Sequence, residues 1–159
     1  MWTLMDSPIG ELRIVERGSA VTAIDFMPSL AESGRPLGAR DDAHPVLSEA
    51  VRQLTAYFAG DLTEFDLPLA LEGSDFQLRV WKELQLIGYG HTASYGEIAQ
   101  RLGMTNAASR AVGLANGRNP IPIVVPCHRV IGADGTLTGY AGGLARKQTL
   151  LELEQDALF

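Results

Sequence analysis

The chain has 159 residues, of which 46% are apolar and 20% are charged, a composition typical of a soluble globular protein with one large domain or two small ones. Its single cysteine, Cys127, excludes an intrachain disulfide framework and fits a reducing compartment. The longest apolar stretch, Ile121 to Pro126, is too short to cross a bilayer, and the charged N-terminal segment is no secretory signal. We therefore expect a cytoplasmic protein with no membrane partner.

The net charge of −6 is unevenly distributed along the chain. Residues 1–73 hold 5 basic and 12 acidic side chains, whereas residues 74–159 hold 8 basic and 7 acidic ones. In the second part, the window from Arg79 to Arg129 has six basic residues against two acidic ones. Such a patch can face a polyanion while the rest of the surface stays acidic. A solvated surface of mixed charge explains the same counts, so charge alone leaves both interpretations open.

The first part of the chain predicts a small antiparallel sheet followed by one helix. Turn-forming residues separate three short β-prone runs, Trp2–Met5, Glu11–Glu16 and Val21–Met27. Residues 28–45 have the composition of a surface loop. Apolar residues then recur with a helical period in Val46–Phe58, just before a glycine. No chemistry is evident in this part.

A change of composition near Gly73 predicts a domain boundary, with an N-terminal domain at residues 1–73 and a C-terminal domain at 74–159. A capping box, Ser74–Gln77, begins the second domain's first helix. The remaining chain is expected to be mainly helical with two short extended pieces, and its last helix spans about residues 143–155. The fold class is therefore α+β, with a small sheet domain carrying one helix and then a mainly helical domain.

The C-terminal domain contains a candidate helix-turn-helix. Ser94 is expected to cap a first short helix, Tyr95–Leu102. After a turn containing glycine, Asn106 caps a second helix, Ala107–Ala115. This second helix is lean, with mostly small side chains and Arg110 as its one long charged group. Such a helix suits a narrow DNA groove, with the arginine reaching the base stack. Tight helix packing, with the arginine in water, explains the same pattern.

The most informative stretch is residues 119–130, where three prolines stiffen a short apolar strand that leads to Cys127. A lone cysteine is usually a small buried hydrophobe. Here His128 and Arg129 follow directly, and cationic neighbours lower the pKa of a thiol and favour its nucleophilic thiolate. We therefore expect an ionised, reachable sulfur at Cys127.

A nucleophilic thiol needs a base, and His128 is the nearest candidate. In an extended chain Cys127 and His128 point to opposite sides, so either the chain turns or a water molecule bridges them. A base also needs an orienting partner, which Glu154 of the last helix supplies unless it lies on a solvated helix face. Tyr140, in the small-residue loop Gly139–Gly143, is expected to form one wall of a flat pocket or to be an ordinary packed tyrosine.

Taken together, these residues resemble the O6-alkylguanine-DNA alkyltransferases, also called methylated-DNA–protein-cysteine methyltransferases. The resemblance runs collinearly from Asp75 to Glu154, just over half of the chain. Its most specific motif is Pro126-Cys127-His128-Arg129-Val130. The other similar blocks are Asp75-Phe76-Gln77 with Val80-Trp81, Ser94-Tyr95-Gly96, Ser109-Arg110-Ala111-Val112-Gly113, Asn119-Pro120 and Gly139-Tyr140-Ala141-Gly142-Gly143. Residues 1–73 resemble the family's small sheet domain more loosely.

The resemblance implies DNA repair by direct reversal of damage. An alkyl group on O6 of guanine in double-stranded DNA would pass irreversibly to Cys127, so each monomeric protein molecule would act once. The second helix would lie in the minor groove, and the damaged base would flip out of the duplex. The transfer needs no metal or other cofactor. Some family members carry a structural zinc on additional cysteine and histidine ligands, and none is expected in a chain with one cysteine.

The resemblance also implies catalytic roles for five residues. Cys127 would accept the alkyl group, and His128 would take its proton through a bridging water. Glu154 would orient the imidazole, and Asn119 would brace the turn between the recognition helix and the acceptor. Tyr95 would press on the target's phosphate and help to protonate the departing guanine.

Two further groups of residues follow from the resemblance. DNA contacts would come from Arg110, Tyr95, Ala107, Ala108, Ala111 and Gly113. Among these, Arg110 would be the finger that fills the gap left by the flipped base. The substrate pocket would be formed by Tyr140, Val130, Ala141 and Gly142. Tyr140 would hydrogen-bond the guanine edge, while the main chain at Cys127 and Val130 would recognise the exocyclic amine.

Two positions depart from the family pattern. Gly88 stands where a proline is common, and Ala141 stands where several members have a serine.

Three other functions are alternatives to repair. A damage-binding module without an acceptor is disfavoured by the presence of Cys127. A thiol hydrolase would show repeated turnover and leaves the lean helix unexplained. A helix-turn-helix regulator would need a dimer interface.

Overall fold

The computed structural model describes residues 1–28 and 38–156. The chain divides into two compact units, Met1–Leu71 and Glu72–Phe159. The observed division lies two residues before the boundary expected from composition. No helix in the described part of the chain is long and apolar enough to span a membrane.

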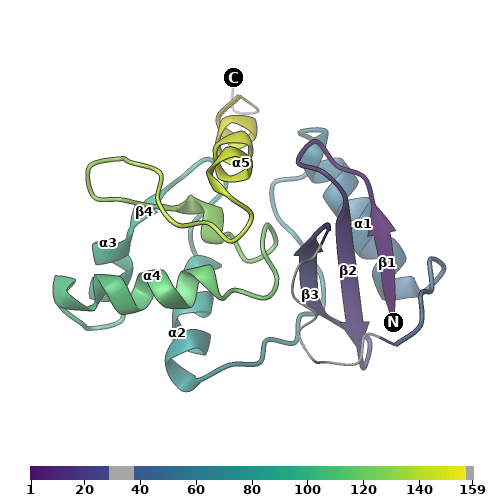
Figure 1. Ribbon diagram of the computed structural model, residues 1–159, viewed down its shortest axis with the longest axis horizontal. Helices are drawn as coiled ribbons and strands as arrows, with labels where there is room; N and C mark the ends of the chain where they lie inside the picture. Colours follow the sequence, from purple (N-terminus) through teal and green to yellow (C-terminus); the bar gives the residue numbers. More distant parts are fainter. Residues whose placement is uncertain (29–37, 157–159) are drawn as a thin grey trace. The chain divides into compact units, whose positions relative to one another are not determined.

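The first unit is a three-stranded antiparallel sheet with one helix packed against it (Figure 1). Its strands β1 (Trp2–Met5), β2 (Leu12–Arg17) and β3 (Ala20–Phe26) pair in the order β1-β2-β3. Helix α1 (Pro45–Phe58) contacts all three strands and buries its apolar stripe against them. The expected loop at residues 28–45 lies partly outside the described residues, and Arg40 within it forms a bridge to Trp2.

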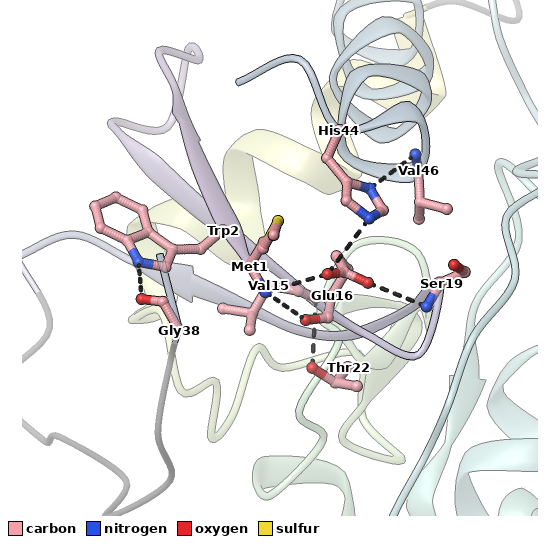
Figure 2. Close-up of polar contacts among 9 residues, drawn as sticks. All are labelled: Met1, Trp2, Val15, Glu16, Ser19, Thr22, Gly38, His44 and Val46. Atoms are coloured by element: carbon pink, nitrogen blue, oxygen red, sulfur yellow. Dashed lines mark hydrogen bonds and ion pairs between the residues drawn. The ribbon is translucent and has the colours of Figure 1, made fainter. Parts of the chain in front are cut away.

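Figure 2 shows how the buried carboxylate of Glu16, near the end of β2, joins the sheet to the start of α1. It accepts hydrogen bonds from the Met1 amine and the Ser19 N–H, each at 3.1 Å, and the Nε2 atom of His44 lies 3.5 Å away. His44 caps α1, since its Nδ1 atom accepts a hydrogen bond from the Val46 N–H at 3.2 Å. Neutral His44 therefore carries its proton on Nε2, facing the carboxylate.

The second unit is mainly helical, which confirms the α+β fold class. Two short strands, β4 (Ala93–Ser94) and β5 (Val130–Ile131), pair in parallel within it. Its α-helices are α2 (Asp75–Leu84), α3 (Tyr95–Arg101), α4 (Ser109–Gly117) and α5 (Leu144–Asp156).

Helix α2 packs against both helices of the helix-turn-helix, α3 and α4. It begins at the expected capping box, in which Ser74 and Gln77 each accept a backbone N–H of the other. The indole of Trp81 is 2% exposed, and its Nε1 atom donates a 2.8 Å hydrogen bond to the Ala115 carbonyl of α4. This bond and the burial of the ring tie the two helices together.

The helix-turn-helix is present, but its second helix begins differently from the expectation. Helix α3 starts at its expected cap, Ser94. Asn106 is not an N-cap: Asn106–Ala108 form a 3₁₀ turn, and α4 begins two residues after Ala107. The side-chain oxygen of Asn106 accepts a hydrogen bond from Gln100 at 3.1 Å, which directs it toward α3 instead.

The apolar stretch before Cys127 is not the expected strand. Its backbone forms consecutive turns, in which Val125 N–H donates to the Ile121 carbonyl at 3.0 Å. Ile123 has a φ of +74°, which no strand residue adopts. Proline supplies no backbone N–H donor. A run flanked by prolines therefore forms its backbone hydrogen bonds more easily within turns than with a neighbouring strand. The buried side chains of this run anchor the segment that leads to Cys127.

We expect Trp81→Phe to lower the free energy of unfolding by about 1 to 2 kcal/mol, because it removes the buried hydrogen bond to Ala115 and leaves space beside α4. Urea denaturation followed by circular dichroism measures this change. An unchanged unfolding midpoint would show that the indole bond does not hold α4 in place.

Candidate active site

The candidate acceptor lies at the start of a tight turn rather than at the end of a strand. Cys127 opens the 3₁₀ turn Cys127–Arg129 and is 4% exposed. Its N–H donates to the Val125 carbonyl at 2.8 Å. Its own carbonyl accepts the Val130 N–H and, at 3.2 Å, the Nδ2 atom of Asn116 from α4. The backbone at the sulfur is therefore fixed on both sides.

The expectation of a lowered thiol pKa is wrong. Burial raises the pKa of Cys127 to about 11, although a hydrogen bond with Asn119 and the nearby charge of Lys147 act in the opposite direction. His128 and Arg129 do not act on the sulfur as cations, because both face a carboxylate instead. The thiol is thus protonated at neutral pH and needs a base before it can act as a nucleophile.

His128 and Glu154 form the buried pair that supplies this base. The Nε2 atom of His128 lies 2.7 Å from Oε2 of Glu154, and both side chains are no more than 1% exposed. Burial lowers the pKa of His128 against the opposing effect of Glu154. Burial raises the pKa of Glu154, but hydrogen bonds from His128 and Arg129 outweigh it and bring that pKa to about 2. The carboxylate is charged, and the imidazole is neutral.

This pairing fixes the tautomer of the histidine. A charged carboxylate can only accept a hydrogen bond, so the nitrogen that faces it must carry the proton: neutral His128 is protonated on Nε2, and Nδ1 carries a lone pair. Nδ1 is buried and has no hydrogen-bond partner within residues 1–28 and 38–156. Of the two arrangements expected to let Cys127 and His128 act together, a chain turn and a bridging water, the structure has the chain turn, at Cys127–Arg129. A buried, unprotonated nitrogen next to the acceptor residue is suited to receive its proton, directly or through water.

Arg129 holds the carboxylate in place. Its Nε and Nη2 atoms donate to Glu154 at 2.8 and 3.0 Å, and its Nη1 atom donates to the Ile87 carbonyl at 2.6 Å. The guanidinium also lies 5.8 Å from the ring centre of Tyr89. The carboxylate of Glu154 therefore accepts hydrogen bonds both from the base, His128, and from a fixed cation, Arg129.

Lys147 is a buried residue of the site that the sequence reasoning missed. Its Nζ atom donates to the carbonyls of Val130 and Thr138, so it joins α5 to β5 and to the preceding loop. Burial lowers the pKa of Lys147 to about 8, while its interaction with Cys127 raises it. Residues 147, 150 and 154 lie on one helix face, and this spacing could have assigned Lys147 to the buried side of α5.

Asn119 braces the turns before the acceptor. Its Nδ2 atom donates to the Val125 carbonyl at 2.7 Å, and its Oδ1 atom accepts the Ile121 N–H at 3.0 Å. The same side chain hydrogen-bonds with the thiol of Cys127. One buried amide thus fixes both the path of the chain and the environment of the sulfur.

A pocket of about 390 Å³ opens beside the helix-turn-helix. At its wall, the Tyr95 hydroxyl and Thr138 are joined by two 3.1 Å hydrogen bonds, one donated in each direction. Tyr140 directly follows the lining residue Gly139, is itself buried, and interacts through its hydroxyl with Cys127. The pocket is lined by Tyr95, Ser109, Arg110, Gly113, Leu114, Thr138 and Gly139.

The structure places the remaining expected residues in two regions. In the 3₁₀ turn before α4, Ala107 is exposed and Ala108 is half-buried, and on α4 itself Arg110 and Ala111 are exposed and Gly113 is half-buried. Leu114 lies on the same face, is 64% exposed and lines the pocket, although an apolar residue in a helix predicts core. In the other region Val130 is buried, Gly142 is half-buried and Ala141 is exposed, and none of these three lines the pocket.

Residues 1–28 and 38–156 contain no group of three or more His, Cys, Asp or Glu side chains arranged to hold a metal ion. Acid–base chemistry around a single thiol is what this arrangement of side chains supports.

Comparison with known proteins matches both units to one family. The model of the 6-O-methylguanine DNA methyltransferase ribonuclease-like domain matches residues 1–71, and the model of its DNA binding domain matches residues 75–156. The chain belongs to the 6-O-methylguanine DNA methyltransferase family. The family resemblance expected from the Cys127 motif is thereby confirmed, and it extends over the first unit as well.

Individual members of this methyltransferase family are similar over nearly the whole chain. A methylated-DNA–protein-cysteine methyltransferase of Mycobacterium bovis is 57% identical over 151 residues, covering 95% of this chain and 90% of the relative. The crystal structure of the Mycobacterium tuberculosis O6-methylguanine methyltransferase has a TM-score of 0.90 at 55% identity, covering 98% of this chain and 93% of the other. A structure of Mycobacterium tuberculosis OGT in complex with DNA has a TM-score of 0.89 at 53% identity, with the same coverage.

Glu154→Gln should remove a pH-dependent part of the stability. The pKa of Glu154 lies below its ordinary value of 4.5, so its stabilisation is complete above pH 4.5 and is lost as the pH falls towards about 2. The wild-type advantage over the glutamine variant should therefore shrink by about 2 kcal/mol between pH 7 and pH 3. Urea denaturation at both pH values measures it. An advantage that is equal at the two pH values contradicts a charged Glu154.

Proposed function

We propose that this protein repairs DNA directly, by moving the alkyl group of O6-alkylguanine to the sulfur of Cys127 in one irreversible turnover. The observation that carries this proposal is a buried thiol beside a neutral histidine whose tautomer is fixed by Glu154, in a chain of this family. The names of its relatives, methylated-DNA–protein-cysteine methyltransferases, describe the same reaction.

The proposed transfer needs no cofactor, because the protein and the base account for every proton and electron pair that moves. His128 takes the thiol proton at Nδ1 through a bridging water, and the resulting thiolate attacks the alkyl carbon in line with the leaving oxygen. A C–S bond forms, the C–O6 bond breaks, and its electron pair stays with the guanine, which then takes up a proton. The thioether product has no leaving group that water can displace, so one protein molecule repairs one lesion.

The nearby groups support separate parts of this step. Lys147 places a cationic group close enough to Cys127 to stabilise the developing thiolate, and Asn119 hydrogen-bonds the same sulfur. Tyr95, at the pocket wall, is the proposed proton source for the departing base. Its hydroxyl is hydrogen-bonded to Thr138, another residue of the pocket wall.

We further propose that the protein binds double-stranded DNA through the minor groove, with α4 as the recognition helix. Two small exposed side chains, Ala107 in the turn before α4 and Ala111 on α4, let the backbone approach the sugar edges, and Arg110 reaches into the space of the flipped base. The relative solved with DNA supports DNA binding. A monomeric, cytoplasmic protein stays a prediction from the sequence.

The acceptor role predicts a mass change confined to one residue. After the wild-type protein is mixed with a duplex containing O6-methylguanine, intact-protein mass spectrometry should show one added methylene unit, located at Cys127. Cys127→Ser and Cys127→Ala should bind the duplex as the wild type does and gain no mass. The acceptor assignment fails if either variant is methylated, and loss of DNA binding in both variants would contradict a purely chemical role.

The finger role of Arg110 predicts an effect that depends on the substrate. Arg110→Ala should slow transfer from duplex DNA at saturating DNA by about tenfold or more, because flipping a base costs a few kcal/mol. Transfer from a free alkylated base needs no flipping and should change by less than about twofold. Arg101→Ala, which removes the same charge at the end of α3 outside the pocket lining, is the matched control. Equal losses on both substrates exclude the finger role.

A further inference from the structure

The carbonyl of Cys127 accepts hydrogen bonds from two donors of the protein. It accepts the Val130 N–H that closes the 3₁₀ turn, and it also accepts a 3.2 Å hydrogen bond from Nδ2 of Asn116. A peptide carbonyl has two lone pairs. Both are therefore engaged by the protein itself, next to the sulfur at which the reaction takes place.

Asn116 stands at a position where a polar side chain needs an explanation. It lies on the buried face of α4 and is 1% exposed. Since a carbonyl oxygen can only accept a hydrogen bond, the amide group must present its donor, Nδ2, to Cys127, which leaves Oδ1 pointing elsewhere. Oδ1 is buried without a hydrogen-bond partner in the described part of the chain. A half-satisfied buried amide is the exception in folded proteins, and here its one bond goes to the acceptor residue.

The second carbonyl beside the site is engaged in a similar way. The Val130 carbonyl accepts a hydrogen bond from the buried ammonium of Lys147. The two main-chain oxygens next to the acceptor thus already have strong side-chain donors from α4 and α5. A base that presents an exocyclic amine to either oxygen would have to share it with, or displace, one of these donors.

We propose that Asn116 is a positioning residue that determines specificity: by engaging the Cys127 carbonyl, it weakens the protein's selection for the 2-amino group of guanine. This inference rests on the proposed alkyl transfer and concerns which bases that transfer accepts. With the carbonyl engaged, a 6-alkoxypurine that lacks the 2-amino group loses little binding relative to guanine. With the carbonyl released, the amine gains an acceptor and guanine is preferred more strongly.

The test compares two lesions that differ only in the amine. Duplexes carrying O6-methylguanine or O6-methylhypoxanthine at one site are reacted with the protein at saturating DNA, and single-turnover rate constants are measured. Asn116→Leu keeps the size and branching of the side chain but has no donor. The ratio of the guanine rate to the hypoxanthine rate should rise by about threefold or more in this variant, the size of one ordinary hydrogen bond. A ratio that is unchanged or lower overturns the proposal.

Two further variants separate specificity from loosened packing. Val112→Ala removes volume from the buried face of α4 without touching the Cys127 carbonyl, so both rates should fall together and their ratio should stay constant. Asn116→Ala also lacks the donor and answers the question if the leucine variant does not fold. An equal rise of the ratio in Val112→Ala would overturn the proposal. Failure of the wild-type protein to react with either lesion would contradict the proposed function instead.

Discussion

The site depends on one buried carboxylate. Glu154 accepts hydrogen bonds from His128 and Arg129 while almost completely removed from water, so its charge is compensated on two sides. Because the carboxylate stays ionised, the histidine keeps its proton on the nitrogen that faces Glu154. The other nitrogen, in the residue that directly follows the acceptor, is left unprotonated and buried. The acid–base behaviour of the site follows from this single contact between α5 and the 3₁₀ turn.

The protonated thiol makes that contact necessary. A cysteine whose pKa was lowered by cationic neighbours would react with any electrophile that reached it, whereas burial keeps the Cys127 thiol neutral at rest. Deprotonation then takes place only with a base and with compensating groups in position. Asn119, in the segment between α4 and Cys127, and Lys147, on α5, provide these groups. The thiol of Cys127 is thus reactive only when the folded site holds these groups around it.

The sequence allowed most of the helices and strands, and the motif at the candidate site, to be predicted, because they follow from local patterns. The capping box at Ser74, the short strands and the Cys127-His128 motif are all readable from neighbouring residues. The turns before Cys127 were missed because a proline-bracketed apolar run has the composition of a strand. Lys147 and Asn116 were missed because their partners are main-chain carbonyls distant in sequence. The thiol pKa was predicted wrongly because burial, which no motif encodes, outweighs neighbouring charge.

The protonation state of His128 decides whether it can be the base for Cys127, and nitrogen NMR of its imidazole in the substrate-free protein at neutral pH measures that state. We expect a neutral ring with one protonated nitrogen, Nε2, hydrogen-bonded to Glu154, and one unprotonated nitrogen, Nδ1. A doubly protonated ring, or a neutral ring with its proton on Nδ1, would exclude His128 as that base, since neither form leaves Nδ1 free to take the proton of Cys127.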